Sequence, residues 1–108
     1  MGEPKMVKLT GHLTPDSLRE ALAPVRSPSG ECCVIIDALG MSGYELSARE
    51  VFIEWNKATR NVVRRVAIVT DNALWQTVIA AIGLASRQQI RSFKTMEAAF
   101  SWIGGDAR

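Results

Sequence analysis

The stretch IIDALGMSGYELSAREVF (Ile35–Phe52) leads from an apolar strand into a helix, through a segment with two glycines and two serines. The strand begins earlier, because CCVIID (Cys32–Asp37) is apolar up to its last residue, as is typical of a strand covered on both faces. A helix is predicted from Ala48 to Arg60, and it has an apolar stripe at helical spacing: Val51, Phe52 and Trp55. The intervening segment, Asp37–Ser47, is predicted to be a loop.

Strands and helices alternate along the rest of the chain. Three further strands are predicted at 5–11, 64–70 and 89–93, and the first alternates polar and apolar residues like a half-buried strand near an edge. Helices are predicted after the N-caps Thr14, Asp71 or Asn72, and Thr95. The order β-α-β-α-β-α-β-α predicts an α/β fold with a mostly parallel four-stranded sheet, or a mixed one as the alternative.

Length and composition limit the classes of protein. A chain of 108 residues is predicted to form a single domain over 1–108, with 47% apolar residues available for a core. The net charge of +2 is small, and no aromatic residues interleave with the basic cluster Arg60, Arg64 and Arg65. We therefore expect no nucleic-acid partner.

The cysteines and apolar runs bear on location and metals. Cys32 and Cys33 are neighbours, so a disulfide between them would be strained, and His12 is the single histidine. We expect reduced thiols, no metal site and no cofactor. The first residues, MGEPKMVKLTG, do not have the apolar region of a signal peptide, and the longest apolar run, 73–85, is too short to span a bilayer. A cytoplasmic protein without a membrane span is expected.

The sequence offers a place for a ligand but no catalytic set. Neither a nucleophile elbow, a Walker sequence nor a dinucleotide fingerprint occurs. Asp37 and Glu45 are available carboxylates, but an aspartate at a strand end usually bonds the backbone. We therefore predict that the chain is not an enzyme and has no catalytic residues; a hydrolase using Asp37 and Ser47 is the least favoured reading.

Binding is expected at the carboxyl ends of the strands, where ligands collect in such sheets. The predicted binding loop follows the second strand. Its candidate residues are Asp37, Gly40, Ser42, Gly43, Tyr44 and Glu45. Ser47 opens the sequence SARE, which is a capping box in which Ser47 and Glu50 bond each other's amides. Phosphorylation of Ser47 at the helix N-terminus is the functional alternative.

The helix NALWQTVIAAIGLAS (72–86) is unusually apolar on all sides. Trp75, Ile79 and Ile82 widen its apolar stripe, and little polar surface opposes them. These three residues are predicted to contact a second copy of the chain, a partner or an apolar ligand. The alternative is that the small alanines and Gly83 simply face water.

The segments VKLTGHLTPDSLREAL (7–22), CCVIID (32–37), VRRVAIVT (63–70) and IRSFKTMEAAFSWI (90–103) resemble the STAS domain, and most closely its SpoIIAA-like branch. That branch is grouped with Sec14-type lipid-binding folds. The resemblance covers nearly the whole chain and implies a single STAS-like domain without enzymatic activity in a bacterial cytoplasm.

In signalling members of that family, a serine in an Asp-Ser-Ser-Gly-like sequence is phosphorylated by a partner kinase, and the unphosphorylated form binds the kinase and releases a sigma factor. Aligned from Asp37, this chain has Glu45 at the aspartate, Leu46 at the phosphorylated serine, Ser47 at the next residue and Ala48 at the glycine. The aligned phosphoacceptor is therefore missing.

Two functions follow from these observations. The first is a STAS-like regulatory or protein-interaction module, resembling an anti-sigma-factor antagonist, which binds a kinase-like or sensor partner and forms a dimer. The alternative is a carrier or sensor of a small apolar, lipid-like ligand. The sequence leaves open the partner, the ligand, the oligomeric state and the pathway.

Overall fold

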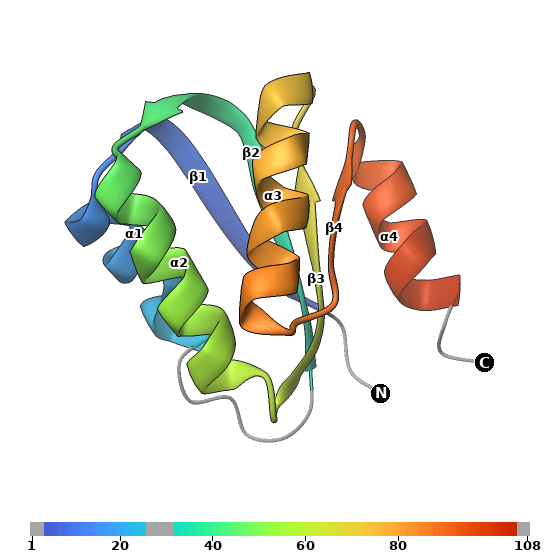
Figure 1. The fold of residues 1–108 in the computed structure, drawn as a ribbon. Helices are drawn as coiled ribbons and strands as arrows, with labels where there is room; N and C mark the ends of the chain where they lie inside the picture. Colours follow the sequence, from blue (N-terminus) through green and yellow to red (C-terminus); the bar gives the residue numbers. More distant parts are fainter. Residues whose placement is uncertain (1–3, 26–31, 106–108) are drawn as a thin grey trace.

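Four parallel strands form one sheet in the order β1-β2-β3-β4, and four α-helices pack on it (Figure 1). The computed structural model describes residues 4–25 and 32–105. The strands are β1 (Lys5–Leu13), β2 (Cys32–Tyr44), β3 (Val63–Val69) and β4 (Ile90–Phe93). The predicted alternation and the parallel sheet are confirmed, and β1 is an edge strand as its pattern indicates.

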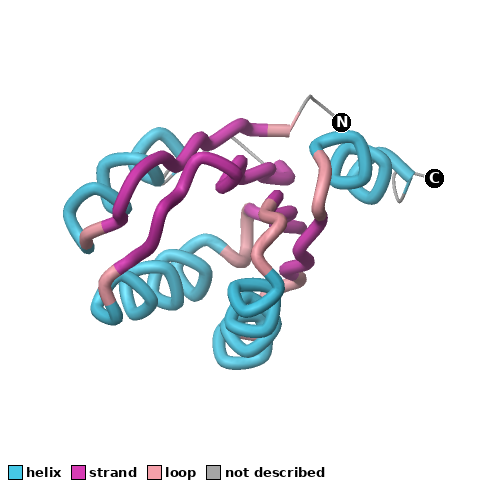
Figure 2. The backbone as a smooth tube through the Cα atoms, turned by 90° about the horizontal axis from the view of Figure 1, so that it is seen from above, coloured by secondary structure: helices cyan, strands magenta, loops and turns pink. Residues whose placement is uncertain are grey.

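The helices divide unequally between the two faces of the sheet. They are α1 (Pro15–Leu22), followed by a 3₁₀ turn η1 (Ala23–Val25), then α2 (Leu46–Thr59), α3 (Ala73–Ser86) and α4 (Met96–Gly105). Each strand lies beside the one before it, and the first three helices pack in one core on the same face. α4 lies on the opposite side of the sheet from α2 and α3 (Figure 2).

The alternation of side chains along β2 supplies both cores. Val34 and Ile36 belong to the core shared with α1, α2 and α3, whereas Cys33 and Ile35 belong to the core under α4. All four are buried, because successive residues of a strand point to opposite faces. The unbroken apolar run of this strand is thus explained by helices on both sides.

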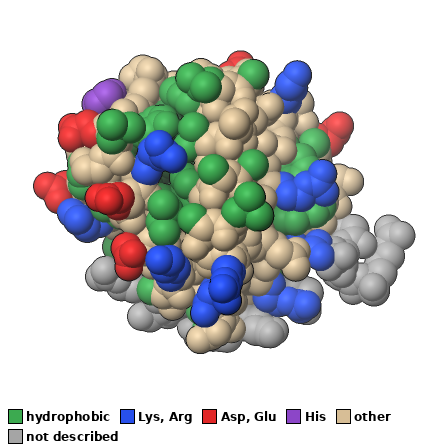
Figure 3. Space-filling view, in the orientation of Figure 1, with side chains coloured by type: hydrophobic (Ala, Val, Ile, Leu, Met, Phe, Trp, Pro, Cys, Tyr) green, Lys and Arg blue, Asp and Glu red, His purple; other side chains and the backbone are tan. Residues whose placement is uncertain are grey.

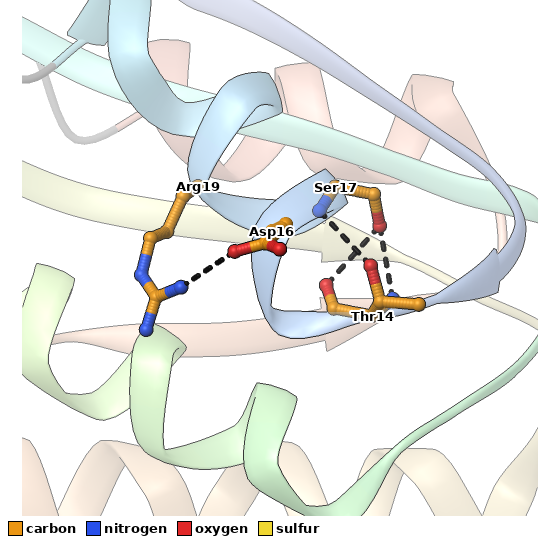
Figure 4. A network of polar contacts seen from close by, with 4 residues as sticks. All are labelled: Thr14, Asp16, Ser17 and Arg19. Atoms are coloured by element: carbon orange, nitrogen blue, oxygen red, sulfur yellow. Dashed lines mark hydrogen bonds and ion pairs between the residues drawn. The ribbon is translucent and has the colours of Figure 1, made fainter.

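Hydrogen bonds fix the predicted starts of three helices. At α1 the Thr14 hydroxyl accepts from the Ser17 amide (3.1 Å), and the Ser17 hydroxyl accepts from the Thr14 amide (2.9 Å), which completes a capping box (Figure 4). Asn72 caps α3 through the Trp75 amide (3.0 Å), and Thr95 caps α4 through the Ala98 amide (3.1 Å). These caps confirm the predictions for Thr14 and Thr95 and select Asn72 over Asp71.

The capping box predicted at Ser47 is wrong. α2 begins at Leu46, its N-cap is Glu45, and no side chain caps it. Ser47 is therefore the second residue inside the helix, where its hydroxyl cannot reach the amide that an N-cap serine would bond. The helix starts early because β2 runs straight into it, with the Glu45 amide donating to the Leu13 carbonyl (2.9 Å).

The predicted loop from Asp37 to Ser47 is also wrong, because most of it is strand. β2 continues to Tyr44, and its last part pairs with the end of β1 from Thr10 to Leu13. Two glycines and two serines indicate a loop by composition, but backbone pairing with β1 overrides that weak local preference. Pro24, Pro28 and Gly30 indicate a connecting loop over 23–31; it contains η1, and its residues 26–31 lie outside the described ranges.

Arginines and aromatic rings that are distant in the sequence meet on the α4 side of the sheet. The guanidinium carbon of Arg65 lies 5.0 Å from the ring centre of Trp102, and that of Arg91 lies 5.7 Å from it. Arg91 also lies over Phe93. These cation–π contacts hold the half-buried Trp102 against the sheet. No helix within residues 4–25 and 32–105 combines the length and apolarity needed to cross a membrane.

Candidate functional site

β1 and β2 extend beyond the other two strands as a two-stranded ribbon. Asp37 pairs with Val69, and Val69 pairs with Phe93, so β3 and β4 end at the level of Asp37. From Ala38 onward β2 has a partner only in β1. The ribbon curves over the carboxyl edge of the sheet (Figure 1), which is the edge where ligands are expected.

Two register shifts decide which side chains of the ribbon face the helices. Leu9 of β1 stands opposite both Ala38 and Leu39, and Ser42 is an extra residue between the pairs Gly11–Met41 and His12–Gly43. Each extra residue reverses the alternation of the strand. The inward positions are therefore even-numbered up to Ala38, odd at Met41 and even again at Tyr44.

An apolar pocket of about 80 Å³ lies beneath the ribbon, between α2 and α3. Figure 3 shows hydrophobic side chains gathered over these two helices on the same face of the molecule. The sheet contributes Leu9, Leu13, Ile36, Ala38, Met41, Tyr44 and Ile68. The helices and the β3–α3 connection contribute Leu18, Ala48, Arg49, Phe52, Thr70, Trp75, Val78, Ile79 and Ile82.

Tyr44 and Trp75 meet at the end of the pocket where β2 passes into α2. Their ring centroids are 6.2 Å apart and the planes are inclined by 68°, an edge-to-face arrangement. Both side chains are half-buried, whereas Ile79 and Ile82 below them are buried. The structure thus unites one residue of the predicted binding loop with the three predicted contact residues of α3.

Among the described residues that line the pocket, Arg49 is the charged one. Its Nε atom is buried and has no hydrogen-bond partner among the described residues. No ion pair or hydrogen bond joins its side chain to any other described residue. The positively charged guanidinium therefore lies beside an apolar surface, and no acidic side chain of the described residues forms an ion pair with it.

The other predicted loop residues lie outside the pocket wall. The Asp37 carboxylate accepts from the Leu39 amide (3.1 Å), which is the backbone-bonding role expected of it. Gly40 and Gly43 approach Thr10 and His12 of β1, at 3.1 and 3.2 Å from where a Cβ would stand. Ser42 and Glu45 are exposed. Of the six residues predicted in this segment, only Tyr44 lines the pocket; its neighbours Ala38 and Met41, which were not predicted, line it as well.

Ser47 lies on the other side of α2, at a wider groove between α1 and α2. This groove has a volume of about 510 Å³ and a mixed lining that includes Arg19, Glu50, Glu54 and Trp55. Ser47 is exposed, and its hydroxyl makes no hydrogen bond with a described residue. Trp55 is buried and stacks on Phe52 with centroids 5.9 Å apart, which fits its predicted place in the core.

The sequence reading missed several pocket residues, chiefly Met41, Arg49 and Val78. Val78 lies in the apolar helix predicted at 72–86 and Arg49 in the helix predicted at 48–60, but neither was predicted to contact a ligand. One usable signal existed, because Arg49 adjoins Ala48 and precedes Phe52 by three residues, so all three share a face of the helix. Met41 carried no signal, since its inward orientation depends on the register shift at Ala38 and Leu39.

Comparison with known proteins places this architecture in a family. The model of the SpoIIAA-like family matches residues 6–104. A solved structure with a SpoIIAA-like fold, an uncharacterized DUF3478-family protein from Shewanella loihica PV-4, superposes with a TM-score of 0.66. It is 21% identical, and the alignment covers 91% of this chain and 82% of that one, so the likeness concerns the fold. No curated protein matches significantly. The chain belongs to the SpoIIAA-like family, and its fold is that of a STAS-type domain.

Proposed function

We propose that this chain is a non-catalytic binding module that carries or senses a small apolar ligand. The observation that supports this function best is the apolar pocket between α2 and α3 at the carboxyl edge of the sheet. Apolar pockets with a few polar groups in their walls are the usual form of small-molecule sites. The ribbon of β1 and β2 and the first turns of two helices surround it.

The chemistry of the wall supports binding without turnover. No aspartate, glutamate, histidine, cysteine or serine is among the described residues that line the pocket. Its polar side chains are those of Tyr44, Arg49 and Thr70, and the Thr70 hydroxyl accepts from the Asn72 amide (3.3 Å). In most hydrolytic mechanisms, the general base or nucleophile is an aspartate, glutamate, histidine, cysteine or serine side chain.

The volume sets the size of the ligand. About 80 Å³ is roughly half of the ~150 Å³ engineered apolar cavity that holds benzene. A short alkyl group fits this space, whereas a complete lipid tail does not. The resemblance to Sec14-type folds suggests a lipid-like ligand, and the pocket volume restricts this class to molecules with a short apolar part.

The experiment uses 1-hexanol as the probe and the indole N–H signal of Trp75 in NMR as the readout. We expect 1-hexanol to shift this signal saturably in the wild-type protein. Val78→Phe fills the pocket and should abolish the shift, because the ring takes the space of the alkyl chain. Val51→Phe makes the same change on the groove side of α2 and should keep binding.

Two outcomes would contradict the proposal. One is a wild-type Trp75 signal that does not move up to the solubility limit of 1-hexanol. The other is equal binding by the wild type and a folded Val78→Phe variant, since the probe would then be held elsewhere. Circular dichroism of each variant establishes that it has folded.

A second candidate is the regulatory module with a protein partner, and exposed leucines favour it. Leu46 and Leu74 are 75% and 71% exposed at the starts of α2 and α3, close to pocket residues Arg49 and Trp75 in the chain. Leu46 occupies the aligned phosphoacceptor position, and the uncapped, exposed Ser47 follows it. A partner would cover both leucines and insert an apolar side chain into the mouth of the pocket.

Pull-down with matched variants tests this candidate. Leu74→Glu should release a kinase-like or sensor partner, whereas Leu84→Glu at the far end of α3 should retain it, although Leu84 is 84% exposed. Equal recovery with both variants would remove this surface from consideration. Phosphate on Ser47, sought by mass spectrometry after incubation with the captured partner, tests the modification separately.

A further inference from the structure

We propose that the ligand of the pocket is an amphipathic anion, a short apolar chain that ends in a carboxylate bound by Arg49. This inference rests on the proposed function and adds the charge of the ligand to it. It is carried by the juxtaposition of an unpaired guanidinium and an apolar cavity that has no acidic residue in its described wall.

The electrostatic state of Arg49 is the first step. Its Nε–H is buried without an acceptor among the described residues, and a donor left in that state costs free energy. The side chain as a whole is half-buried, so part of the guanidinium remains reachable from the mouth of the pocket. A carboxylate there would accept a charge-assisted hydrogen bond, in the bidentate geometry that suits a guanidinium.

The acidic residues near Arg49 do not form ion pairs with it. Glu45 lies four residues before Arg49 on the same side of α2, yet no ion pair joins them. Glu50 and Glu54 line the groove on the other side of the helix. Two ion pairs of the described residues, Arg19–Asp16 and Lys57–Glu54, lie away from the pocket. The described part of the chain therefore places a cation at this position without an ion-pair partner.

The position of Arg49 in α2 adds to the attraction. It lies in the first turn of a helix of 14 residues that starts at Leu46 without a side-chain cap. The positive end of the helix dipole therefore points toward the same edge as the pocket mouth, and it favours an anion over a cation. The apolar lining beneath excludes a purely ionic ligand, because such an ion would leave the cavity unfilled.

Three probes with the same six-carbon chain test the charge of the ligand, namely hexanoate, 1-hexanol and hexylammonium, titrated at pH 7.5 against the Trp75 indole signal. Hexanoate should bind about tenfold more tightly than 1-hexanol, which corresponds to one charge-assisted hydrogen bond. Hexylammonium should bind more weakly than the alcohol, because Arg49 repels it.

Arg49→Met keeps the length of the side chain and removes its charge. It should weaken hexanoate binding about tenfold and leave 1-hexanol binding within twofold. Arg49→Lys should retain a part of the preference for hexanoate, because the charge remains but the bidentate geometry is lost. Arg64→Met is the matched control, since Arg64 is exposed near the amino end of β3, and it should leave all three affinities unchanged.

The outcomes separate the two proposals. If 1-hexanol binds in the pocket and hexanoate binds no better, the amphipathic anion is excluded while the apolar site stands. The same holds if Arg49→Met retains the full preference for hexanoate. If none of the three probes shifts the Trp75 signal, the proposed function itself fails.

Discussion

The rings of Tyr44 and Trp75 meet edge to face, with their centroids 6.2 Å apart. This contact joins the last residue of β2 to the first turn of α3, and so ties the ribbon of β1 and β2 to the far wall of the pocket. In the chain, α2 and β3 lie between the ribbon and α3. The pair therefore fixes the width of the pocket at this end.

A double-mutant cycle should measure this link. Tyr44→Leu and Trp75→Leu each keep an apolar side chain but remove the edge-to-face geometry. We expect a coupling free energy of about 0.5–1.5 kcal/mol from urea unfolding of the two single variants and the double variant. A coupling near zero would show that the two rings contribute independently and do not hold the ribbon to α3.

Asn72 caps its helix in the structure, whereas Ser47 resembles a cap only in the sequence, and alanine substitutions should distinguish the two. Asn72→Ala should lower the free energy of unfolding by about 1 kcal/mol, because the Trp75 amide loses its acceptor. Ser47→Ala should change it by less than about 0.5 kcal/mol, since the Ser47 hydroxyl caps nothing in α2. Chemical denaturation of both variants decides the matter. A large loss for Ser47→Ala would reinstate the capping box that SARE suggests.

Glycine at position 11 is required by the backbone of β1. Gly11 has a φ of +69°, where a side chain is strained although the space around it is open. Gly11→Ala should therefore destabilise the fold by about 1–2 kcal/mol. Gly104→Ala is the control, because Gly104 lies in α4 with open space around it, and it should stabilise by up to about 1 kcal/mol. Thermal unfolding of the two variants should shift in opposite directions.

The thiol of Cys32 should react slowly. Burial raises the pKa of Cys32, the neighbouring Cys33 raises it further, and Lys5 lowers it. In a Cys33→Ala background, the rate of iodoacetamide labelling can be followed as a function of pH. The midpoint, the pH at which this rate is half-maximal, should lie above that of free cysteine. Lys5→Gln should move the midpoint higher, whereas Lys8→Gln should leave it in place. A midpoint below that of free cysteine would contradict this assignment.

The raised pKa of Cys32 also makes the stability of the fold depend on pH. Because the folded state holds the Cys32 proton more tightly than the unfolded chain does, the thiol favours folding below its unfolded pKa. This contribution is lost as the pH rises through the folded value. The effect belongs to alkaline solutions, and the Cys32→Ala variant should lack it in a series of unfolding measurements at increasing pH.

The sequence predicts the layers of this fold well because they depend on burial patterns. The run from Val34 to Ile36 is apolar at every position, as is typical of a strand between two layers of helices, and α4 supplies the second layer. Thr14 and Thr95 were recognisable caps because each precedes its own helix without competing structure. Such signals are local, and a single sequence contains them.

The pocket was harder to predict because it depends on pairing between distant segments. Ser42 and Gly43 look like loop residues, and only the alignment of β1 beside them makes them strand. Trp75, Ile79 and Ile82 were predicted as contact residues from the apolar surface of their helix. Arg49 was not, because its spacing from Phe52 indicates at most a place near the apolar face of the helix and does not show that its Nε is enclosed.

Because β2 contains two extra residues, the number of residues between Asp37 and Tyr44 determines which side chains face the pocket. Removing Ser42 alone would swing Tyr44 toward the opposite face of the ribbon, although every side chain in contact with the cavity would still be encoded. Relatives that have the same pocket-lining residues but one residue more or fewer in this segment would therefore have a pocket with a different lining. Conversely, substitutions at Ser42 itself should be tolerated freely, so a count of residues from Asp37 to Tyr44 says more about shared specificity than percentage identity does.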